Sequence, residues 1–238
     1  MSATFKTEAV VLRSIRFGEA DRVLHLLSPD HGRIGAVAKG VRRVKSRLGG
    51  RLEPLGRVRL VLHQGRGDLC TITSADTVHA HPGLREHRAS LEHATGACEA
   101  VLRLFDSAEA NRPAYNLLCH HLALLDSEPA AATRARSLAF RSKLVLAAGF
   151  APELAACASC GEAEDLSGFS PAQGGVVCAS CEAGSFPFGE EAHRFMVDAL
   201  ASPLADSPDA GERALGQADR AISETVEHHA HVRFRRVA

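Results

Sequence analysis

Apolar and polar residues alternate over the first 80 residues in short runs separated by turn-forming residues. Five such runs lie at residues 7–17, 22–28, 33–40, 55–63 and 68–78. In the fourth run Val58, Leu60 and Leu62 occupy every second position, which is typical of a half-buried strand. Five short strands predict a small closed barrel, and the OB-fold is the obvious five-stranded candidate. Periodicity alone does not separate it from an SH3-like barrel.

From Pro82 onward the apolar spacing becomes helical. Helices are expected over residues 84–105, from Pro113, over 130–148 with a stop at Gly149, over 190–201 and over 209–232. The intervening segment 153–187 is rich in Cys, Gly and Ser and shows little periodicity. This segment is therefore predicted to be an insertion in a helical domain.

Seven cysteines fall into two groups. Three are isolated in apolar stretches, where buried free thiols are expected: Cys70, Cys98 and Cys119. The others form C-x₂-C-x₁₇-C-x₂-C and are Cys157, Cys160, Cys178 and Cys181. This spacing is typical of a four-cysteine zinc ribbon, with iron as an occasional alternative. Four sulfur ligands fill the coordination shell, so the predicted Zn²⁺ is structural and not catalytic.

Two other interpretations of these residue types are weaker. A thioredoxin-like redox pair lacks a strand-to-helix context, and a second C-x-x-C would be redundant. A second metal site at His228, His229 and His231 is the other interpretation, but no cysteine or carboxylate cluster accompanies them. A solvated helix end is the favoured interpretation.

These patterns predict an α+β protein. An N-terminal five-stranded OB-fold barrel is expected over residues 1–80. A helical domain occupies 81–238 and is interrupted at 153–187 by the zinc knuckle.

Charge is distributed unevenly along a chain that is neutral overall. Residues 1–80 carry a net charge of +7 and residues 81–238 a net charge of −7. Six cations lie within residues 39–51 with no acidic residue among them: Lys39, Arg42, Arg43, Lys45, Arg47 and Arg51. In an OB barrel this stretch connects strands 3 and 4, where a basic loop can follow nucleic-acid phosphates. A solvated loop and a nuclear-localisation signal are the alternatives.

Aromatic residues are scarce in the same region, since only Phe5 and Phe17 occur before residue 81. Base stacking on aromatic rings is the usual second component of single-strand binding. We therefore predict binding that depends on phosphate contacts and on salt and has little sequence selectivity.

The sequence offers no motif of an enzyme. Phosphate-binding, nucleophile-elbow, zinc-protease and dinucleotide-binding motifs are missing, which favours a binding protein over a catalyst. No apolar stretch is long enough to span a membrane, and the first residues lack the features of a signal peptide, which predicts a cytoplasmic protein.

Three stretches together resemble the RecO family of bacterial DNA repair proteins. Residues 8–56, with the steps Ala38–Gly40 and Lys45–Arg47, resemble its N-terminal barrel. "FRSKLVLAAGFAPELAACASCG" resembles the entry into its metal knuckle, and "FSPAQGGVVCASC" resembles the exit. The resemblance spans essentially the whole chain.

The resemblance implies a non-enzymatic mediator of DNA recombination and of the repair of DNA damage. Such a protein binds single- and double-stranded DNA, anneals complementary strands and works with RecR to load the RecA recombinase. It acts on strands coated by single-strand-binding protein, whose acidic C-terminal tail it also binds, and it is nucleoid-associated. The six loop cations match the family's DNA-binding region.

Some assignments stay open at this stage. Arg13, Arg16, Arg57 and Arg59 are further DNA-contact candidates, depending on strand alternation. From charge alone, Arg134, Arg136, Arg141 and Lys143 are candidates for a pocket that accepts the acidic tail. A zinc-ribbon transcription or RNA-binding factor and a metal-dependent nuclease are the alternative functions.

Overall fold

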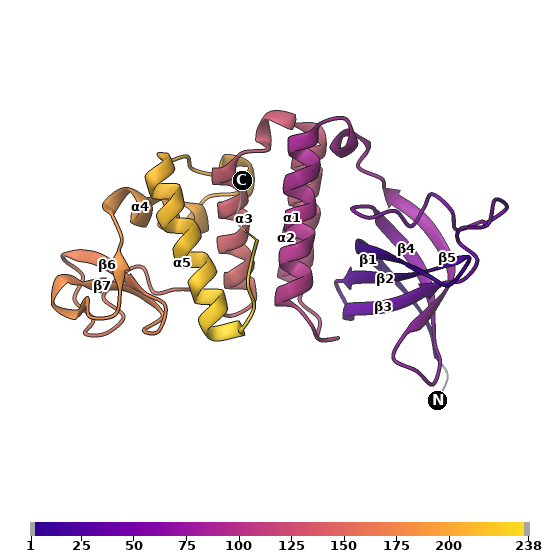
Figure 1. The fold of residues 1–238 in the computed structure, drawn as a ribbon, viewed down its shortest axis with the longest axis horizontal. Coiled ribbons are helices and arrows are strands. Elements are labelled where there is room, and N and C mark those ends of the chain that lie inside the picture. Colours follow the sequence, from indigo (N-terminus) through magenta and orange to yellow (C-terminus); the bar gives the residue numbers. More distant parts are fainter. Residues whose placement is uncertain (1–2, 236–238) are drawn as a thin grey trace. The chain divides into compact units, whose positions relative to one another are not determined.

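The computed structural model describes residues 3–235. The chain divides into two compact units, Met1–Pro129 and Ala130–Ala238. The first contains a barrel and two helices, and the second contains three helices and a small sheet. Figure 1 labels the elements along the chain.

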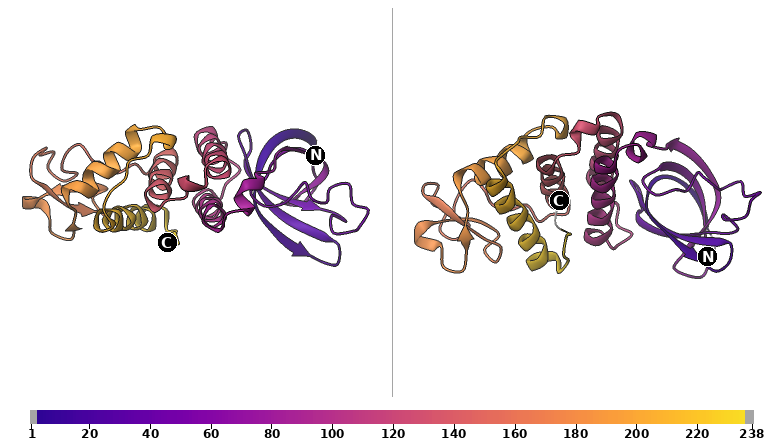
Figure 2. Two further views of the ribbon diagram at one scale, coloured as in Figure 1. Left: turned by 90° about the horizontal axis from the view of Figure 1, so that it is seen from above. Right: turned by 45° about the horizontal axis from the view of Figure 1, so that its top comes forward.

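Five strands form a closed barrel in the first unit. They are β1 (Ala3–Phe17), β2 (Asp21–Ser28), β3 (Gly32–Ala38), β4 (Arg57–Gln64) and β5 (Cys70–His79), and they close in the order β1-β2-β3-β5-β4. The right view of Figure 2 shows the strands as a ring. All pairings are antiparallel except that of β3 with β5, where Ala36 lies opposite Cys70. The OB-fold prediction is confirmed by this arrangement.

The alternation along each strand explains the barrel core. Leu24 and Leu26 of β2 and Leu60 and Leu62 of β4 point inward and are fully buried. The long strand β1 pairs with β4 through its first half and with β2 through its second half. A register shift after Val11 lets the strand bend between the two partners.

Two helices complete the first unit. After a 3₁₀ turn at Pro82–Arg85 come α1 (Arg88–Leu104) and α2 (Arg112–Ser127), which contact β1 and β2. Val10 and Leu27 lie opposite each other on these strands and are buried although they lie outside the barrel core. The sequence places the end of the first domain at residue 80, whereas the first compact unit extends to Pro129 because this helical pair covers one side of the barrel.

The second unit is built on α3 (Arg134–Ala147), α4 (Glu190–Ala201) and α5 (Glu212–Ala230), which pack against one another. The helix expected over 130–148 begins later, because a 3₁₀ turn occupies Pro129–Ala131 and the Thr133 hydroxyl accepts a hydrogen bond from the N–H of Arg136. Another 3₁₀ turn, Leu204–Asp206, links α4 to α5. Within residues 3–235 no helix is long and apolar enough to cross a membrane.

Residues 153–187 contain regular structure that periodicity does not reveal. Strands β6 (Leu166–Ser170), β7 (Gly175–Cys178) and β8 (Phe186–Pro187) form an antiparallel sheet in the order β7-β6-β8. A 3₁₀ turn, Ala179–Cys181, follows β7. Phe169, Phe186 and Phe188 cluster behind the sheet with ring centroids 5.3–6.4 Å apart.

Candidate metal centre and candidate nucleic-acid interface

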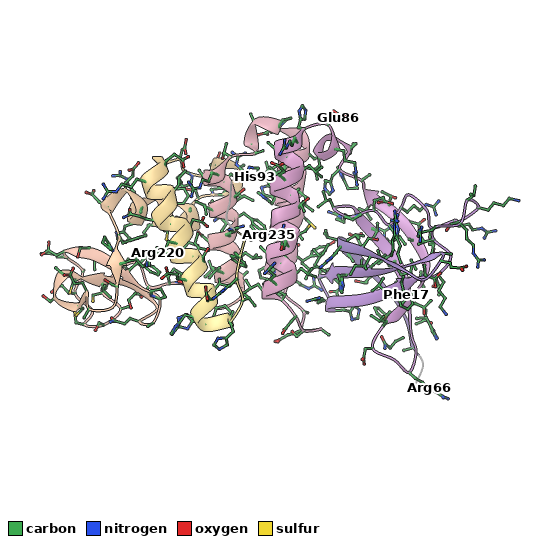
Figure 3. All side chains as sticks on the ribbon, in the orientation of Figure 1. Phe17, Arg66, Glu86, His93, Arg220 and Arg235 are labelled. Atoms are coloured by element: carbon green, nitrogen blue, oxygen red, sulfur yellow. The ribbon has the colours of Figure 1, made fainter. Side chains whose placement is uncertain are left out.

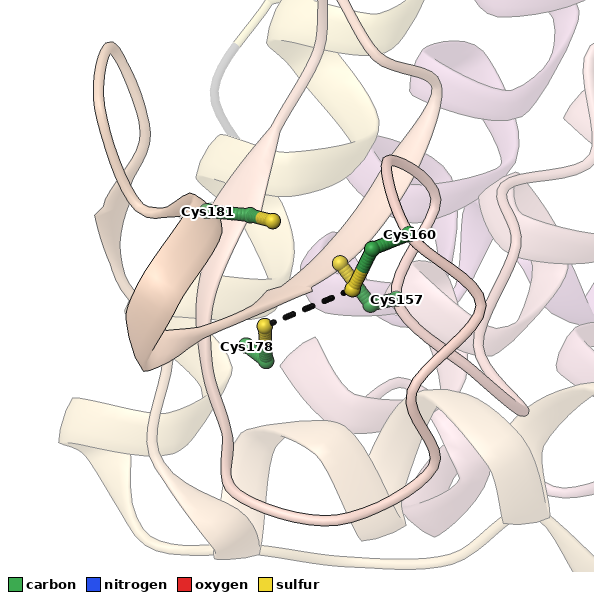
Figure 4. A group of neighbouring side chains, drawn as sticks. All are labelled: Cys157, Cys160, Cys178 and Cys181. Carbon is green, nitrogen blue, oxygen red and sulfur yellow. Dashed lines mark hydrogen bonds between the residues drawn. The ribbon is translucent and has the colours of Figure 1, made fainter.

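The four predicted metal ligands converge on one point. The Sγ atoms of Cys157, Cys160, Cys178 and Cys181 all lie within 4.8 Å of one another. Figure 4 shows the first pair on a loop, Cys178 at the end of β7 and Cys181 on the turn after it. Among residues 3–235 this is the one group of three or more Cys, His, Asp or Glu side chains whose ligand atoms converge in this way.

The donor set fits a tetrahedral metal ion. A zinc–sulfur bond of about 2.3 Å requires sulfur atoms roughly 3.8 Å apart. The Sγ atoms of Cys160 and Cys178 are separated by 3.7 Å. Four soft thiolates are the ligands of structural zinc sites and leave no open position for a substrate. The cluster is therefore compatible with a structural Zn²⁺.

Local backbone geometry holds the thiols in place. The N–H of Gly161 donates to the Cys157 carbonyl at 2.8 Å, and Gly161 has a φ of +80° that suits glycine. The N–H of Ala158 donates to Val176 of β7 at 2.8 Å, which ties the first cysteine pair to the strand carrying the second. The tight turns thus hold both pairs in position to share one ion.

The thiols differ in acidity. Hydrogen bonding from the backbone of Cys178, opposed by desolvation and assisted by the Cys160 backbone, lowers the pKa of Cys157 to about 6. A backbone hydrogen bond from Glu162 lowers the pKa of Cys160, but the neighbouring thiols of Cys157 and Cys178 outweigh it and raise the pKa to about 12. Negative charge in the metal-free cluster thus gathers on Cys157, and metal binding would displace the other protons.

The basic stretch forms the connection between β3 and β4 and is anchored in the barrel. Val41 and Leu52 belong to the barrel core, being 6% and 1% exposed, and Leu48 packs against it. The start of the loop is held by the Asp21 carboxylate, which accepts the N–H of Gly40 at 2.7 Å. The N–H of Arg42 donates to Ala20 in the β1–β2 turn at 2.9 Å. The loop is therefore a folded part of the barrel surface.

All six predicted DNA-contact side chains are exposed on this loop. Arg51 donates to the carbonyls of Arg47 and Ala75, and Arg42 donates to the carbonyl of Glu19. Within the described part of the chain none of the six lies within 4 Å of a carboxylate. Their charge is therefore not neutralised by the protein.

The four additional candidates on the strands separate into two pairs. Arg57 and Arg59 both lie against the Glu8 carboxylate, at 3.4 and 3.0 Å. Arg13 and Arg16 are exposed and make no ion pair among the described residues. Glu8 lies 51 positions before Arg59 in the sequence, and the pairing of β1 with β4 brings it to both arginines.

The cations proposed for an acidic-tail pocket are largely occupied within the second unit. Arg141 is 5% exposed, lies 3.5 Å from the Asp219 carboxylate and donates to the carbonyl of Arg235. Arg134 lies against Glu212 and Asp219. The Lys143 ammonium donates to the Leu200 carbonyl at 2.9 Å, and burial lowers its pKa. Charge counting along the sequence missed these partners, because Asp219 and Glu212 lie on α5.

The C-terminal histidines lie at an exposed helix end. His228 and His229 are on the last turn of α5, and His231 follows it in a left-handed conformation. His229 contacts the Pro171 carbonyl through Nε2 at 2.9 Å. This placement agrees with the favoured interpretation of a solvated helix end.

The fold and the two sites define an OB-fold protein with a folded basic loop and a four-cysteine knuckle. Comparison with known families matches residues 1–81 to the model "Recombination protein O N terminal" and residues 85–236 to "Recombination protein O C terminal".

Curated relatives give the same assignment. The chain is 36% identical to the DNA repair protein RecO of Rubrobacter xylanophilus, over 92% of this chain and 89% of the relative. It is 37% identical to that of Cutibacterium acnes over 79% and 78%, and 32% identical to that of an Anaeromyxobacter species over 96% and 92%. The chain belongs to the RecO family of DNA repair proteins.

Proposed function

We propose that this protein is a non-enzymatic recombination mediator that binds single- and double-stranded DNA and anneals complementary strands. With RecR it helps to load the RecA recombinase onto strands coated by single-strand-binding protein, whose acidic C-terminal tail is a further partner. It acts in the cytoplasm in association with the nucleoid. Family membership supports this role, and the exposed, unneutralised loop cations are the observation that carries it.

In this proposal DNA binds to the basic loop between β3 and β4. Lys39, Arg42, Arg43, Lys45, Arg47 and Arg51 contact phosphates. Anchoring by Val41 and Leu52 keeps these side chains on one folded surface, so less conformational entropy is lost when the backbone of DNA binds. Arg13 and Arg16 extend the surface, whereas Arg57 and Arg59 share the Glu8 carboxylate, which offsets one of their two charges.

Annealing follows from electrostatics. Two complementary strands repel each other through their phosphates, and a surface dense in cations reduces that repulsion when both strands lie close to it. Contacts with phosphate carry no sequence information, so any complementary pair is accepted. The chemistry required is charge neutralisation, for which a binding protein suffices.

The knuckle has a supporting role. Cys157, Cys160, Cys178 and Cys181 would hold a structural Zn²⁺ that cross-links the loop before β6 to the end of β7. Because the sheet has strands of only two to five residues, it needs such a cross-link to stay folded.

The test is annealing of two complementary labelled oligonucleotides at several salt concentrations. The intact protein is compared with a variant carrying Arg42→Glu, Arg43→Glu, Lys45→Glu and Arg47→Glu that retains its zinc. We expect rapid, salt-sensitive annealing by the intact protein and a large loss in the variant. Absence of annealing by the intact protein at any salt, with equal affinity for structured RNA, would instead favour a zinc-ribbon RNA-binding factor.

A further inference from the structure

The outer face of β1, β2 and β3 carries an apolar strip. Strand register places Ile15 opposite Val23, and Val23 opposite Val37. Leu24, next to Val23, and Ala36 and Ala38, on either side of Val37, belong to the barrel core, so Val23 and Val37 point outward. Ile15 is 40% exposed, and Val23 and Val37 are partly exposed.

Two further apolar side chains extend this strip. Phe17 lies two residues beyond Ile15 on the same face and is 56% exposed. Leu69, from the β4–β5 turn, is 42% exposed and lies directly over β3, since a Cβ on Gly35 would sit 2.7 Å from its Cδ2. Arg66, from the same turn as Leu69, projects from the barrel in Figure 3. The five side chains Phe17, Ile15, Val23, Val37 and Leu69 are called the apolar strip.

Cations border the strip. Arg13 is the next outward residue beyond Ile15, and Lys39 is the next beyond Val37. The one carboxylate opposite Phe17, that of Asp21, already accepts the N–H of Gly40. His25 lies in the row with Arg13, and burial, followed by the nearby Arg33 and Arg13, lowers its pKa, so it is neutral at pH 7. The cations at the border therefore favour an anionic ligand over a cationic one.

The basic loop begins beside the same face. Lys39 directly follows β3, and the backbone of Arg42 is hydrogen-bonded to the β1–β2 turn that connects Phe17 to β2. The outer face over strands 2 and 3, with the loops β1–β2 and β4–β5, is where OB barrels hold oligonucleotides. One surface thus joins exposed cations to exposed apolar side chains.

We infer that the apolar strip contacts the bases of an unpaired DNA strand while the loop cations hold its phosphates. This inference rests on the proposed function and deepens it, since it divides the interface into a base-contacting part and a phosphate-contacting part. From Ile15 to Val37 the strip spans two strand spacings, about 10 Å, room for about three stacked bases at roughly 3.4 Å each. A duplex keeps its bases paired and stacked, so it contacts the loop cations but not the apolar strip.

The inference adds base contacts to the phosphate contacts that the sequence predicts. Phe5 is half-buried, lies 4.5 Å from the His31 ring and packs against the barrel core. Phe17 is the aromatic side chain available to a base in this barrel, and aliphatic side chains complete the strip.

The test compares binding of an unpaired thymidine oligonucleotide, an abasic strand with the same number of phosphates and a duplex of equal length. The variant is Ile15→Thr with Phe17→Ser, which changes exposed positions and keeps the charge. The matched control is Leu146→Ser with Val197→Ser, two exposed apolar residues of the second unit that are 48% and 41% exposed. Fluorescence anisotropy at fixed salt gives each affinity, and sedimentation gives the oligomeric state.

We expect the intact protein to bind the thymidine strand more tightly than the abasic strand. In the variant this preference should disappear, because its affinity for the thymidine strand should fall by about tenfold. A loss of this size corresponds to the removal of roughly one stacking contact. Duplex affinity should stay within about twofold, and the control should match the intact protein.

Three results would overturn the inference. One is equal affinity of the intact protein for thymidine and abasic strands. Another is an equal loss on all three ligands in the variant. The third is a lower oligomeric state in the variant than in the intact protein, with unchanged DNA binding, which would make the strip a protein interface. If the intact protein binds none of the three ligands, the result contradicts the proposed function itself, on which the inference rests.

Discussion

The Glu8 carboxylate accepts a hydrogen bond from Nη2 of Arg59 at 3.0 Å, across the pairing of β1 with β4. The same carboxylate lies 3.4 Å from Nε of Arg57. One carboxylate thus pairs with two of the barrel's arginines. The six cations of the β3–β4 loop, in contrast, have no carboxylate within 4 Å among residues 3–235. The net charge of a segment therefore overstates the number of cations that are available to contact DNA phosphates.

This pairing separates the effects of two single substitutions. Arg43→Ala should weaken single-strand binding several-fold, because it removes an unneutralised phosphate contact. Arg59→Ala should change the affinity by less than about twofold, because that guanidinium is paired with the Glu8 carboxylate, which Arg57 would then hold alone. Anisotropy titrations at one salt concentration measure both. Equal losses from the two substitutions would contradict the assignment of DNA to the loop.

Anchoring of the loop predicts that an uncharged substitution also affects DNA binding. Leu52→Ala should lower the free energy of unfolding by about 2–5 kcal/mol and weaken DNA binding several-fold, because the cations lose their fixed positions. Leu60→Ala is the control, since Leu60 is as deeply buried but lies within β4. Urea unfolding and DNA titration of both variants are compared. If the two variants lose stability and DNA affinity to the same extent, the anchor has no specific role.

Metal removal should unfold the knuckle and spare the barrel. We expect a single zinc ion per chain, and Cys178→Ser or a strong chelator should lower the melting temperature through loss of a contribution on the order of 10 kcal/mol to local folding. Cys98→Ala, which changes a buried isolated thiol, should retain zinc. Elemental analysis, thermal unfolding and DNA binding are measured together. An unchanged melting curve after zinc removal would rule out a structural metal.

His81 predicts a loss of stability in mild acid. Its ring is buried, Nδ1 lies 2.8 Å from the Leu55 carbonyl, and burial lowers its pKa below the usual 6.5. The folded state therefore binds fewer protons, so the free energy of unfolding is fully present above pH 6.5 and falls as the pH drops toward the folded-state pKa.

The corresponding variant is His81→Asn, because asparagine tolerates the left-handed backbone at this position, with φ of 46°. Urea unfolding at pH 7.5 and pH 5.5 should show a smaller acid-induced loss in the variant than in the intact protein. His87→Asn, at an exposed position, controls for the substitution itself. Identical acid-induced losses in the intact protein and His81→Asn would show that His81 is not responsible.

Local sequence patterns were sufficient to predict the barrel and the four-cysteine cluster. Period-two alternation in runs such as residues 55–63 marks strands whose inner side chains form the core, and the C-x₂-C spacing fixes which thiols meet. The sheet at β6–β8 was missed because strands of two to five residues are too short to show a period. Pairing of Arg141 with Asp219 depends on two helices far apart in sequence, so charge counting did not find it.

The outward apolar strip was also not predicted. Ile15 and Leu69 are ordinary strand and turn residues in the sequence, and only closure of the barrel places them near the same face. The sequence did contain a weak signal, since Phe17 directly precedes a glycine turn at the end of an alternating run.

The most direct test of the central claim is the salt dependence of single-strand binding. The logarithm of affinity should fall linearly with the logarithm of salt concentration, by about 0.7 per phosphate contact. Removing four contacts through Arg42→Ala, Arg43→Ala, Lys45→Ala and Arg47→Ala, with zinc retained, should reduce the magnitude of that slope by about 3. An unchanged slope would show that the DNA phosphates lie elsewhere on the protein.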